Sequence, residues 1–423
     1  MPVGTGAGLA MGTGESDRAA ASDETRRREV LAIAAPLAIY FGAMHAVNGA
    51  ALPYLNVWLA STGLSLGEIA VIATVAPVVR MICGPVSSLV ADMTQSHRLL
   101  LIAFGWAWFA SWVLLANTTT FQVALVAQVL ISAAAAGLSP LIEAIAVSSV
   151  RTRGIDYGRV RVWGSITFIL ASLAGGWLVD WRGIGVVIWL LVVGALATAL
   201  AGHLVPRAAS GIASGRRIGW ADTLSLVQAP VFLTFLLAAG LVQAGHATLY
   251  TFSVIHWQAQ GLSNTWCGAL WAIGVIAEIV LFTWSAKLFR GWSPVTFLLA
   301  GAIAGALRWA LMAFDPPLAL LIPLQVLHGL TFGASHIGAI QFLARAVPDG
   351  QGGTAQGLYM LVTSGIFMAV ATGVAGLAYT RYGGMAYLPM AVLSAAGALA
   401  FVALERMWRG GVIGAVAGAE HSD

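Results

Sequence analysis

Residues 99–117 read LLLIAFGWAWFASWVLLAN, a run of 19 residues without a charged side chain. A helix rises about 1.5 Å per residue, so a run of this length spans most of a bilayer core about 30 Å thick. The same pattern recurs along the whole chain of 423 residues. We count twelve apolar segments, near residues 30–58, 68–91, 99–117, 121–149, 160–180, 184–205, 229–256, 265–289, 295–313, 318–345, 355–380 and 384–405.

The composition supports a membrane protein. Hydrophobic residues make up 59% of the chain and charged residues only 9%, whereas soluble domains carry about 25% charged residues. An ordinary cytosolic enzyme is therefore excluded. The two cysteines, Cys83 and Cys267, both lie in apolar runs, so we predict neither a disulfide framework nor a metal site.

The basic residues predict the orientation. With twelve spans and both termini on one side, that side holds 17 of the 21 lysines and arginines. The opposite loops hold only Arg182 and Arg381, while Arg80 and Arg308 fall within spans. Cytoplasmic loops retain positive charge. We therefore expect a multi-pass protein of a bacterial cytoplasmic (inner) membrane, with both termini in the cytoplasm.

An internal repeat predicts two similar halves. Gly63-Leu64-Ser65 recurs 198 residues later as Gly261-Leu262-Ser263, and the same offset pairs Asn48 with His246 and Arg80 with Glu278. Two parallel six-span halves are the architecture of major facilitator transporters, whose substrate site lies between the halves. The expected fold is thus an all-α membrane protein with twelve transmembrane helices in two pseudo-symmetric six-helix halves. The expected divisions are a flexible cytoplasmic tail 1–28, halves 29–205 and 229–407, a cytoplasmic linker 206–228 and a cytoplasmic tail 408–423.

Ionisable groups inside apolar spans are the candidate site. A charge at the bilayer centre costs about 2.5–3.5 kcal/mol on insertion scales, so such groups face a cavity or a partner. Their depths allow two pairs, Glu278 with Arg308 and Arg80 with Glu143. Each pair is either a permanent ion pair that holds two helices together, or a switch in which the carboxylate takes up a proton and releases its arginine. The candidates for proton coupling are Glu278, Glu143, His328 and His336, and those for substrate binding are Arg80, Arg308, His246, Tyr250 and Asn48.

The histidines suit proton relay because imidazole titrates near neutrality. His328 and His336 are eight residues apart and can face one cavity if the segment is helical. A histidine inside a bundle can equally be a hydrogen-bonded packing residue. Near residues 88–98, SLVADMTQSHR resembles the loop motif between spans 2 and 3 of major facilitator transporters. Asp92 and Arg98 match it best, and they are the candidate conformational latch.

Two common enzyme motifs are lacking in the sequence: there is no H-E-x-x-H and no Walker phosphate loop. No cofactor is expected, and without an ATP site any uphill transport must use an ion gradient.

Three blocks carry a closer resemblance. They are YGRVRVWGS (157–165), QAGHATLYTFSVIHWQAQG (243–261) and QVLHGLTFGASHIGA (325–339) followed by AQGLY. Together they resemble the phenylpropionate permease family of the major facilitator superfamily. The resemblance implies proton-coupled uptake of a small aromatic acid, and Arg80, His246, Glu278, Arg308, His328 and His336 fall on family positions.

The sequence therefore predicts a secondary transporter, a proton symporter that imports a small aromatic carboxylate. The expected partners are a small-molecule substrate, protons and the lipid bilayer, with no nucleic acid, and we expect a monomer. Open alternatives are a symporter of a neutral nucleoside or oligosaccharide, a proton-coupled exporter of hydrophobic compounds, and a membrane receptor that does not transport.

Overall fold

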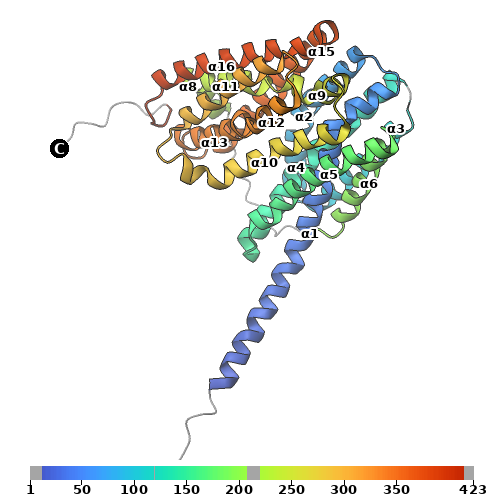
Figure 1. Cartoon of the computed structure of the whole chain (residues 1–423). Coiled ribbons are helices and arrows are strands. Elements are labelled where there is room, and N and C mark those ends of the chain that lie inside the picture. The colour runs from blue at the N-terminus through green and yellow to red at the C-terminus, as the bar shows by residue number, and fades with distance from the viewer. Residues whose placement is uncertain (1–11, 119, 207–219, 414–423) are drawn as a thin grey trace, which may run out of the picture.

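The computed structural model describes residues 12–118, 120–206 and 220–413, which form helices and connecting turns with no strand among them (Figure 1). The α-helices are Gly12–Ser61 (α1), Leu66–Thr94 (α2), His97–Ala116 (α3), Phe121–Arg153 (α4), Tyr157–Arg182 (α5), Val186–Gly202 (α6), Trp220–Gln228 (α7), Pro230–Ala244 (α8), Ala247–Ala259 (α9), Asn264–Leu288 (α10), Pro294–Met312 (α11), Leu318–Val326 (α12), Ser335–Ala346 (α13), Gly352–Met360 (α14), Met368–Tyr382 (α15) and Tyr387–Met407 (α16). Two π-helical segments, Gly329–Ala334 (η1) and Leu361–Phe367 (η2), and a 3₁₀ turn, Gly383–Ala386 (η3), complete the described chain.

The helices give twelve crossings. Ten helical stretches of the described chain are long and apolar enough to span a membrane. One of them, Gly352–Met407, has 56 residues and folds back at η3, so it crosses twice. Helix α6 has 17 residues and is the shorter apolar helix that completes the set. The all-helical fold with twelve crossings is the one that the sequence predicts.

Helix α1 begins earlier than expected. The sequence predicts a flexible tail up to residue 28, but α1 is helical from Gly12. Alanines and alternating charges in this stretch favour a helix, and Arg28 pairs with Glu24 one turn earlier at 2.6 Å. In Figure 1 this part of α1 projects away from the bundle. Residues 1–11, most of the predicted linker (207–219) and the end of the predicted tail (414–423) lie outside the described residues.

The crossings pack into two groups. Helix α1 packs on α5 and α6, while α3 packs on α4 and α6. In the second group, α16 packs on α8 and α11. The two groups meet mainly where α5 lies against α10 and α2 against α15. Figure 1 shows the blue-to-green helices on one side and the yellow-to-red helices on the other.

The repeated Gly-Leu-Ser turn has the same structure in both groups. Gly63 and Gly261 have φ of 93° and 89°, which is the left-handed conformation that glycine adopts without strain. Ser65 and Ser263 then cap α2 and α10, each accepting a hydrogen bond from the backbone N–H three residues later. The sequence repeat therefore marks one turn, used twice, between the first and second crossings of each half.

The halves are joined at one face of the bundle. Asp180, at the end of α5, accepts hydrogen bonds from the backbone N–H groups and side chains of Asn264 and Thr265, at 2.6–2.9 Å. Tyr54 Oη donates to the backbone oxygens of Ser172 and Asn264, at 2.8 and 3.2 Å. We call this end the sealed face. Every hydrogen bond between the halves in the described chain lies towards it.

Two glycines allow the close contact at the sealed face. A Cβ atom on Gly268 would lie 2.2 Å from the backbone oxygen of Ser172, and one on Gly176 would lie 2.3 Å from that of Asn264. Any larger residue would therefore push α5 and α10 apart. The opposite ends of the crossings carry Arg98, Arg153, Arg290, Arg345 and Arg406, and we call them the arginine-rich face.

Candidate functional site

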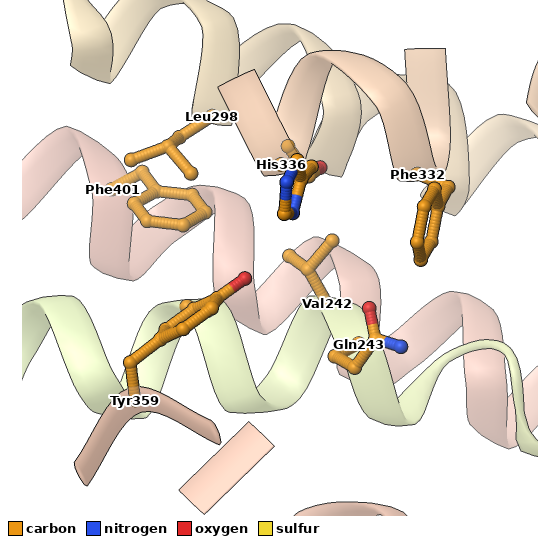
Figure 2. Close-up of a pocket in the computed structure, with 9 residues that line it drawn as sticks. Val242, Gln243, Leu298, Phe332, His336, Tyr359 and Phe401 are labelled. Atoms are coloured by element: carbon orange, nitrogen blue, oxygen red, sulfur yellow. The ribbon is translucent and has the colours of Figure 1, made fainter. Parts of the chain in front are cut away.

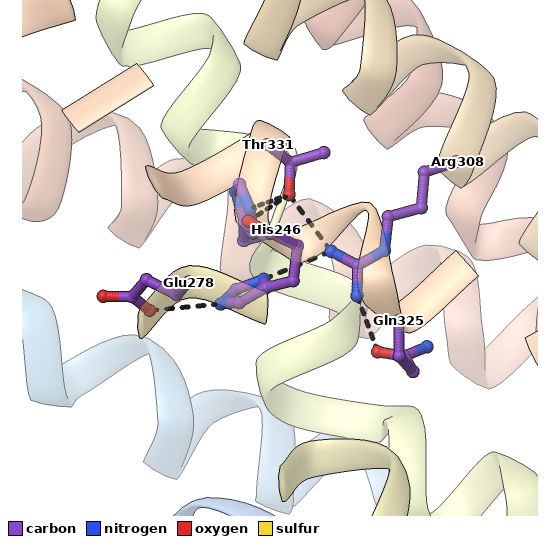
Figure 3. A network of polar contacts seen from close by, with 6 residues as sticks. His246, Glu278, Arg308, Gln325 and Thr331 are labelled. Atoms are coloured by element: carbon purple, nitrogen blue, oxygen red, sulfur yellow. Dashed lines mark hydrogen bonds and ion pairs between the residues drawn. The ribbon is translucent and has the colours of Figure 1, made fainter. Parts of the chain in front are cut away.

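A buried polar network lies inside the second half (Figure 3). Its centre is Arg308 of α11, whose residue is 0% exposed. One terminal nitrogen of Arg308 donates to Gln325 Oε1 at 2.6 Å, and the other lies 3.2 Å from His328 Nδ1 and 3.1 Å from Thr331 Oγ1. Thr331 Oγ1 is also 3.2 Å from His246 Nε2. None of these partners is a carboxylate.

Arg308 fixes the tautomer of His328. A guanidinium has only donors, so His328 Nδ1 accepts from Arg308 and the proton of the neutral ring is on Nε2. His246 Nδ1 lies 3.3 Å from the backbone oxygen of Gln243, which can only accept, so Nδ1 carries a proton. The Thr331 hydroxyl accepts from Arg308 and has two neighbouring acceptors, His246 Nε2 at 3.2 Å and the backbone oxygen of His328 at 3.5 Å.

Glu278 stands at the edge of this network. Its Oε2 lies 3.9 Å from His328 Nε2, and its side chain is 21% exposed. The expected direct pair of Glu278 and Arg308 is wrong: His328 lies between them, with one ring nitrogen toward each. The sequence allows a pair because Glu278 and Arg308 lie at similar depths along their helices. It does not reveal that the span that carries His328 passes between α10 and α11.

Small residues bring α10 close to the span that contains η1. A Cβ atom on Gly329 would lie 2.9 Å from the backbone oxygen of Ala277, and one on Gly274 would lie 3.4 Å from His328 Cβ. The π-helical hydrogen bonding of η1 stacks the rings of His328, Phe332 and His336, with interplanar angles of 11° and 2°. Such π-helical turns are frequent at functional sites. The two histidines share one face, as the spacing predicts, but Phe332 separates them.

A second cluster lies in the first half. Glu143 of α4 accepts a hydrogen bond from Tyr157 Oη at 2.5 Å and pairs with Arg161 Nε at 3.4 Å. Tyr157 and Arg161 are four residues apart, one turn of α5. The expected pair of Arg80 and Glu143 is therefore wrong, because α5 supplies the cation. Arg80 is exposed and has no hydrogen bond or ion pair within the described chain.

Arg161 belongs to the site but was not among the predicted residues, because it stands at the very start of the predicted segment 160–180 and was counted with the basic residues of the cytoplasmic side. The contacts of Gly176 with Asn264 and of Gly268 with Ser172 set the register of α5 against α10. Continued along both helices, this register brings Arg161 to the level of Glu278, although no hydrogen bond or ion pair joins the two side chains within the described chain. The block YGRVRVWGS contains Arg161, and its Tyr-x-x-x-Arg spacing was the available signal.

The remaining predicted substrate residues are placed as follows. Tyr250 lies near His246 and Trp271, with ring centroids 5.5 and 6.0 Å apart and the rings tilted by 30° in both pairs. Asn48 is half-buried on α1 and makes no hydrogen bond within the described chain. His336 is exposed. The structure therefore gathers His246, Tyr250 and Arg308 around the network, but not Asn48.

The candidate latch residues do not contact each other. Asp92 Oδ1 pairs with His97 Nε2 at 3.2 Å. Arg98 donates to the backbone oxygens of His203 and Val205, at 2.6 and 2.7 Å. Arg98 therefore ties the start of α3 to the carbonyl end of α6, a place where a cation is favourable. Both contacts stay within the first half, and we find none between the halves.

Metal ligands do not gather in the described chain. It contains no group of three or more His, Cys, Asp or Glu side chains arranged to hold an ion.

The fold and the polar network define a membrane transport protein of the major facilitator type. Solved structures share the fold: the nucleoside transporter NupG matches with a TM-score of 0.77 and 19% identity, over 88% of this chain and 99% of that one. A bacterial homologue of the lysosomal transporter Spinster, in an inward-facing conformation, matches with a TM-score of 0.69 and 14% identity, over 90% and 97% of the two chains. The chain belongs to the MFS_1 like family, whose model matches residues 35–388.

Curated relatives are transporters. The chain is 33% identical to a probable 3-phenylpropionic acid transporter of Escherichia coli (strain K12), over 70% of this chain and 78% of that protein. It is 30% identical to a maltose permease of Geobacillus stearothermophilus, over 74% and 79% of the two proteins. The protein is thus a membrane transporter and not an enzyme.

Proposed function

We propose that this protein is a proton symporter that imports a small aromatic carboxylate across a bacterial cytoplasmic membrane. The observation that carries this proposal is the chain of contacts from Glu278 through His328 to Arg308. It places one partly exposed carboxylate at the end of a buried network in which Arg308 donates to His328 Nδ1. Glu278 is therefore the group in this network that is free to gain and lose a proton.

The proton changes what Arg161 contacts. With Glu278 ionised, we expect Arg161, which pairs with Glu143 at 3.4 Å, to be attracted to Glu278 at the same level as well. Protonation of Glu278 removes one of these two charges and leaves Arg161 able to bind an anionic cargo. Arginine holds a carboxylate with two parallel hydrogen bonds. Arg80 is the second exposed cation of the apolar spans, and Arg308 acts through His328 because its terminal nitrogens are already occupied.

The aromatic part of the cargo needs an apolar surface. Tyr250 and Trp271 supply two rings beside Glu278, and aromatic pairs of this kind favour stacking. The relative described as a probable 3-phenylpropionic acid transporter supports this choice of cargo. The retention of positive charge in cytoplasmic loops supports a cytoplasmic location for the arginine-rich face.

A neutral cargo is the second candidate. The maltose permease relative and the NupG fold favour it. In that case Arg161 would remain with its two carboxylates, and cargo hydroxyls would bind to polar side chains such as Tyr250.

Proteoliposomes loaded with the purified protein test the proton role. Glu278→Gln should abolish the accumulation of 3-phenylpropionate driven by a pH gradient, while exchange of labelled for unlabelled 3-phenylpropionate continues. Loss of proton transfer typically costs about 10²–10⁴-fold in rate. Glu68→Gln is the matched control, because Glu68 only caps α2. Accumulation at the normal rate in Glu278→Gln would show that this carboxylate has only a structural role between helices.

Calorimetry of 3-phenylpropionate and its amide tests the cargo. We expect the acid to bind the wild type more tightly, and Arg161→Lys to remove this preference because lysine lacks the guanidinium fork. Equal affinity of acid and amide in the wild type would instead favour the neutral cargo.

A further inference from the structure

Two hollows in the second half differ in size and in lining. The smaller one lies beside the network and has Gln243, His336 and Tyr359 in its wall (Figure 2). Its cavity volume is about 20 Å³, which is the scale of a single water molecule. The larger hollow has a cavity volume of about 650 Å³ and lies between α15 and α16. Of the two, the larger one has room for part of an organic molecule.

Helix packing explains the larger hollow, which we call the hairpin groove. Val370 and Val374 of α15 form one wall, Pro389 and Val392 of α16 form the other, and the small Ala244 of α8 lies between them. The chain turns at η3 from α15 into α16, but α15 packs mainly on α2, whereas α16 packs mainly on α11 and α8. The two helices therefore separate beyond their shared turn and leave the groove between them.

The hairpin groove opens to the surroundings of the bundle. Val370 and Val392, one on each wall, are 64% and 67% exposed, and every residue that lines the groove is apolar. Figure 1 shows α16 along the outer edge of the bundle. Both walls belong to membrane crossings, so the groove meets acyl chains of the bilayer core, where there is no water. A chain that enters the groove gains van der Waals contacts that an empty hollow would forfeit.

A cation stands at one end of the groove. Val370, Val374 and Arg381 are separated by whole turns, which places them on one face of α15. Tyr379 Oη lies 3.3 Å from His256 Nδ1 near the end of α9, so this end of α15 is at the sealed face. From Val370 to Arg381 the helix rises about 16 Å, roughly half of a bilayer core about 30 Å thick. Groove and cation therefore extend over one leaflet, from its middle to its surface.

Arg381 has no anionic partner within the described chain. Its guanidinium carbon lies 5.5 Å from the ring centroid of Tyr382, and no hydrogen bond or ion pair joins it to a described residue. Asp315 comes close to the same turn, but it accepts a hydrogen bond from His256 Nε2 at 2.8 Å. Arginine binds phosphate with two parallel hydrogen bonds. An apolar groove that ends at a free arginine thus matches the two parts of a phospholipid.

We propose that the hairpin groove and Arg381 bind one anionic phospholipid of the leaflet at the sealed face, with an acyl chain in the groove and the phosphate on Arg381. A zwitterionic phospholipid has the same chains and phosphate, but its ammonium offsets the negative charge that attracts arginine. The site involves neither the polar network nor the cargo, so it does not rest on the proposed symport.

Native mass spectrometry of the full-length protein in detergent tests this site. Dioleoyl phosphatidylglycerol is compared with dioleoyl phosphatidylethanolamine, which has the same chains. We expect the wild type to bind one phosphatidylglycerol in preference, and Arg381→Gln to weaken that binding at least about fivefold, the effect of one arginine near anionic lipid. Arg182→Gln is the matched control, because Arg182 lies against Trp181 and lines no part of the groove. Its affinity for the lipid should not change.

A second pair of variants tests the groove itself. Val374→Trp fills the groove and should release the lipid although Arg381 is intact. Leu399→Trp is its control, since Leu399 is an exposed residue of α16 that does not line the groove. Phosphatidylglycerol should also raise the Tm of the wild type, because a ligand that binds the folded state stabilises it. It should not raise the Tm of Arg381→Gln, a variant of an exposed residue that decides the matter even if Val374→Trp fails to fold.

Three results would overturn the proposal. The first is equal affinity of the wild type for the two lipids, or equal affinity of the wild type and Arg381→Gln for phosphatidylglycerol. The second is displacement of the lipid by 3-phenylpropionate, which would make the groove a cargo site. The third is a dimer that dissociates in Val374→Trp, which would make the groove a contact between two copies of the chain.

Discussion

At the scale of single residues, Arg308 holds the neighbouring side chains in position, and both of its terminal nitrogens are already used in hydrogen bonds. Its guanidinium is fully buried, donates to Gln325 and fixes His328 and Thr331. Its ring contact with Trp309, 4.5 Å from the guanidinium carbon, adds a cation–π interaction. We therefore treat Arg308 as a positioning residue for the Glu278–His328 pair.

Replacement of Arg308 should destabilise the fold as well as uncouple transport. Arg308→Met leaves Gln325 Oε1 and His328 Nδ1 without donors, and each buried unsatisfied group costs about 1–3 kcal/mol. Thermal unfolding in detergent should show a clearly lower Tm. Arg80→Met is the matched control, since Arg80 is exposed and unpaired within the described chain, and its Tm should not change. Equal Tm values for the two variants would contradict the structural role of Arg308.

The residues of the site could be predicted only in part. Charges within apolar runs identify Glu143, Glu278 and Arg308 because an intramembrane charge is costly. Their partners could not be predicted, because pairing depends on how each helix is rotated and on what lies between. Arg161 was counted with the cytoplasmic basic residues because it is the second residue of the predicted segment 160–180, whereas α5 begins at Tyr157 and places Arg161 one turn inside the helix.

At the scale of helices, the repeated serine caps contribute to stability. Ser65→Ala and Ser263→Ala should each cost about 1 kcal/mol, the usual value of an N-cap. Ser65 also forms a capping box with Glu68, so its replacement should have the larger effect. Ser96→Ala is the control, because Ser96 precedes α3 without a capping hydrogen bond from its side chain. Denaturant or thermal unfolding of the three variants would show whether the order holds.

Apolar length and turn residues were sufficient to predict the crossings, but not their internal irregularities. The segments η1 and η2 interrupt spans whose sequences look continuously apolar. These π-helical turns depend on packing, such as the contact of Gly365 in η2 with Met81, where a Cβ atom would lie 2.9 Å from the sulfur. Local sequence carries little information about such contacts.

At the scale of the whole molecule, Asp180 holds the sealed face closed. Its four hydrogen bonds cross from α5 to the start of α10. Which face is closed could not be predicted from sequence, because it depends on the relative free energies of two conformations. Cys267 is 0% exposed beside this contact, so its reactivity reports the opening of the sealed face.

Loss of Asp180 should open that face. In a Cys83→Ser background, Asp180→Ala should raise the rate at which an impermeant maleimide labels Cys267 by about tenfold, which corresponds to a shift of about 1.4 kcal/mol in the equilibrium. Asp156→Ala is the matched control, because Asp156 caps the other end of α5. An unchanged rate in Asp180→Ala would show that glycine packing alone closes the face.

The ion pair of Arg161 with Glu143, at the level of Glu278, also has an electrical consequence. Arg161 offsets the charge of a carboxylate, so we expect the protein to carry little net charge of its own through the field when the halves rock. An anion that travels with one proton then moves no net charge, whereas a neutral cargo with one proton moves one, worth about 2.3 kcal/mol per 100 mV. A potassium diffusion potential should therefore leave 3-phenylpropionate uptake unchanged, and a strong response to voltage would contradict one-to-one symport. A bacterium using such a carrier could collect its aromatic acid even when its membrane is depolarised, provided that the pH difference remains.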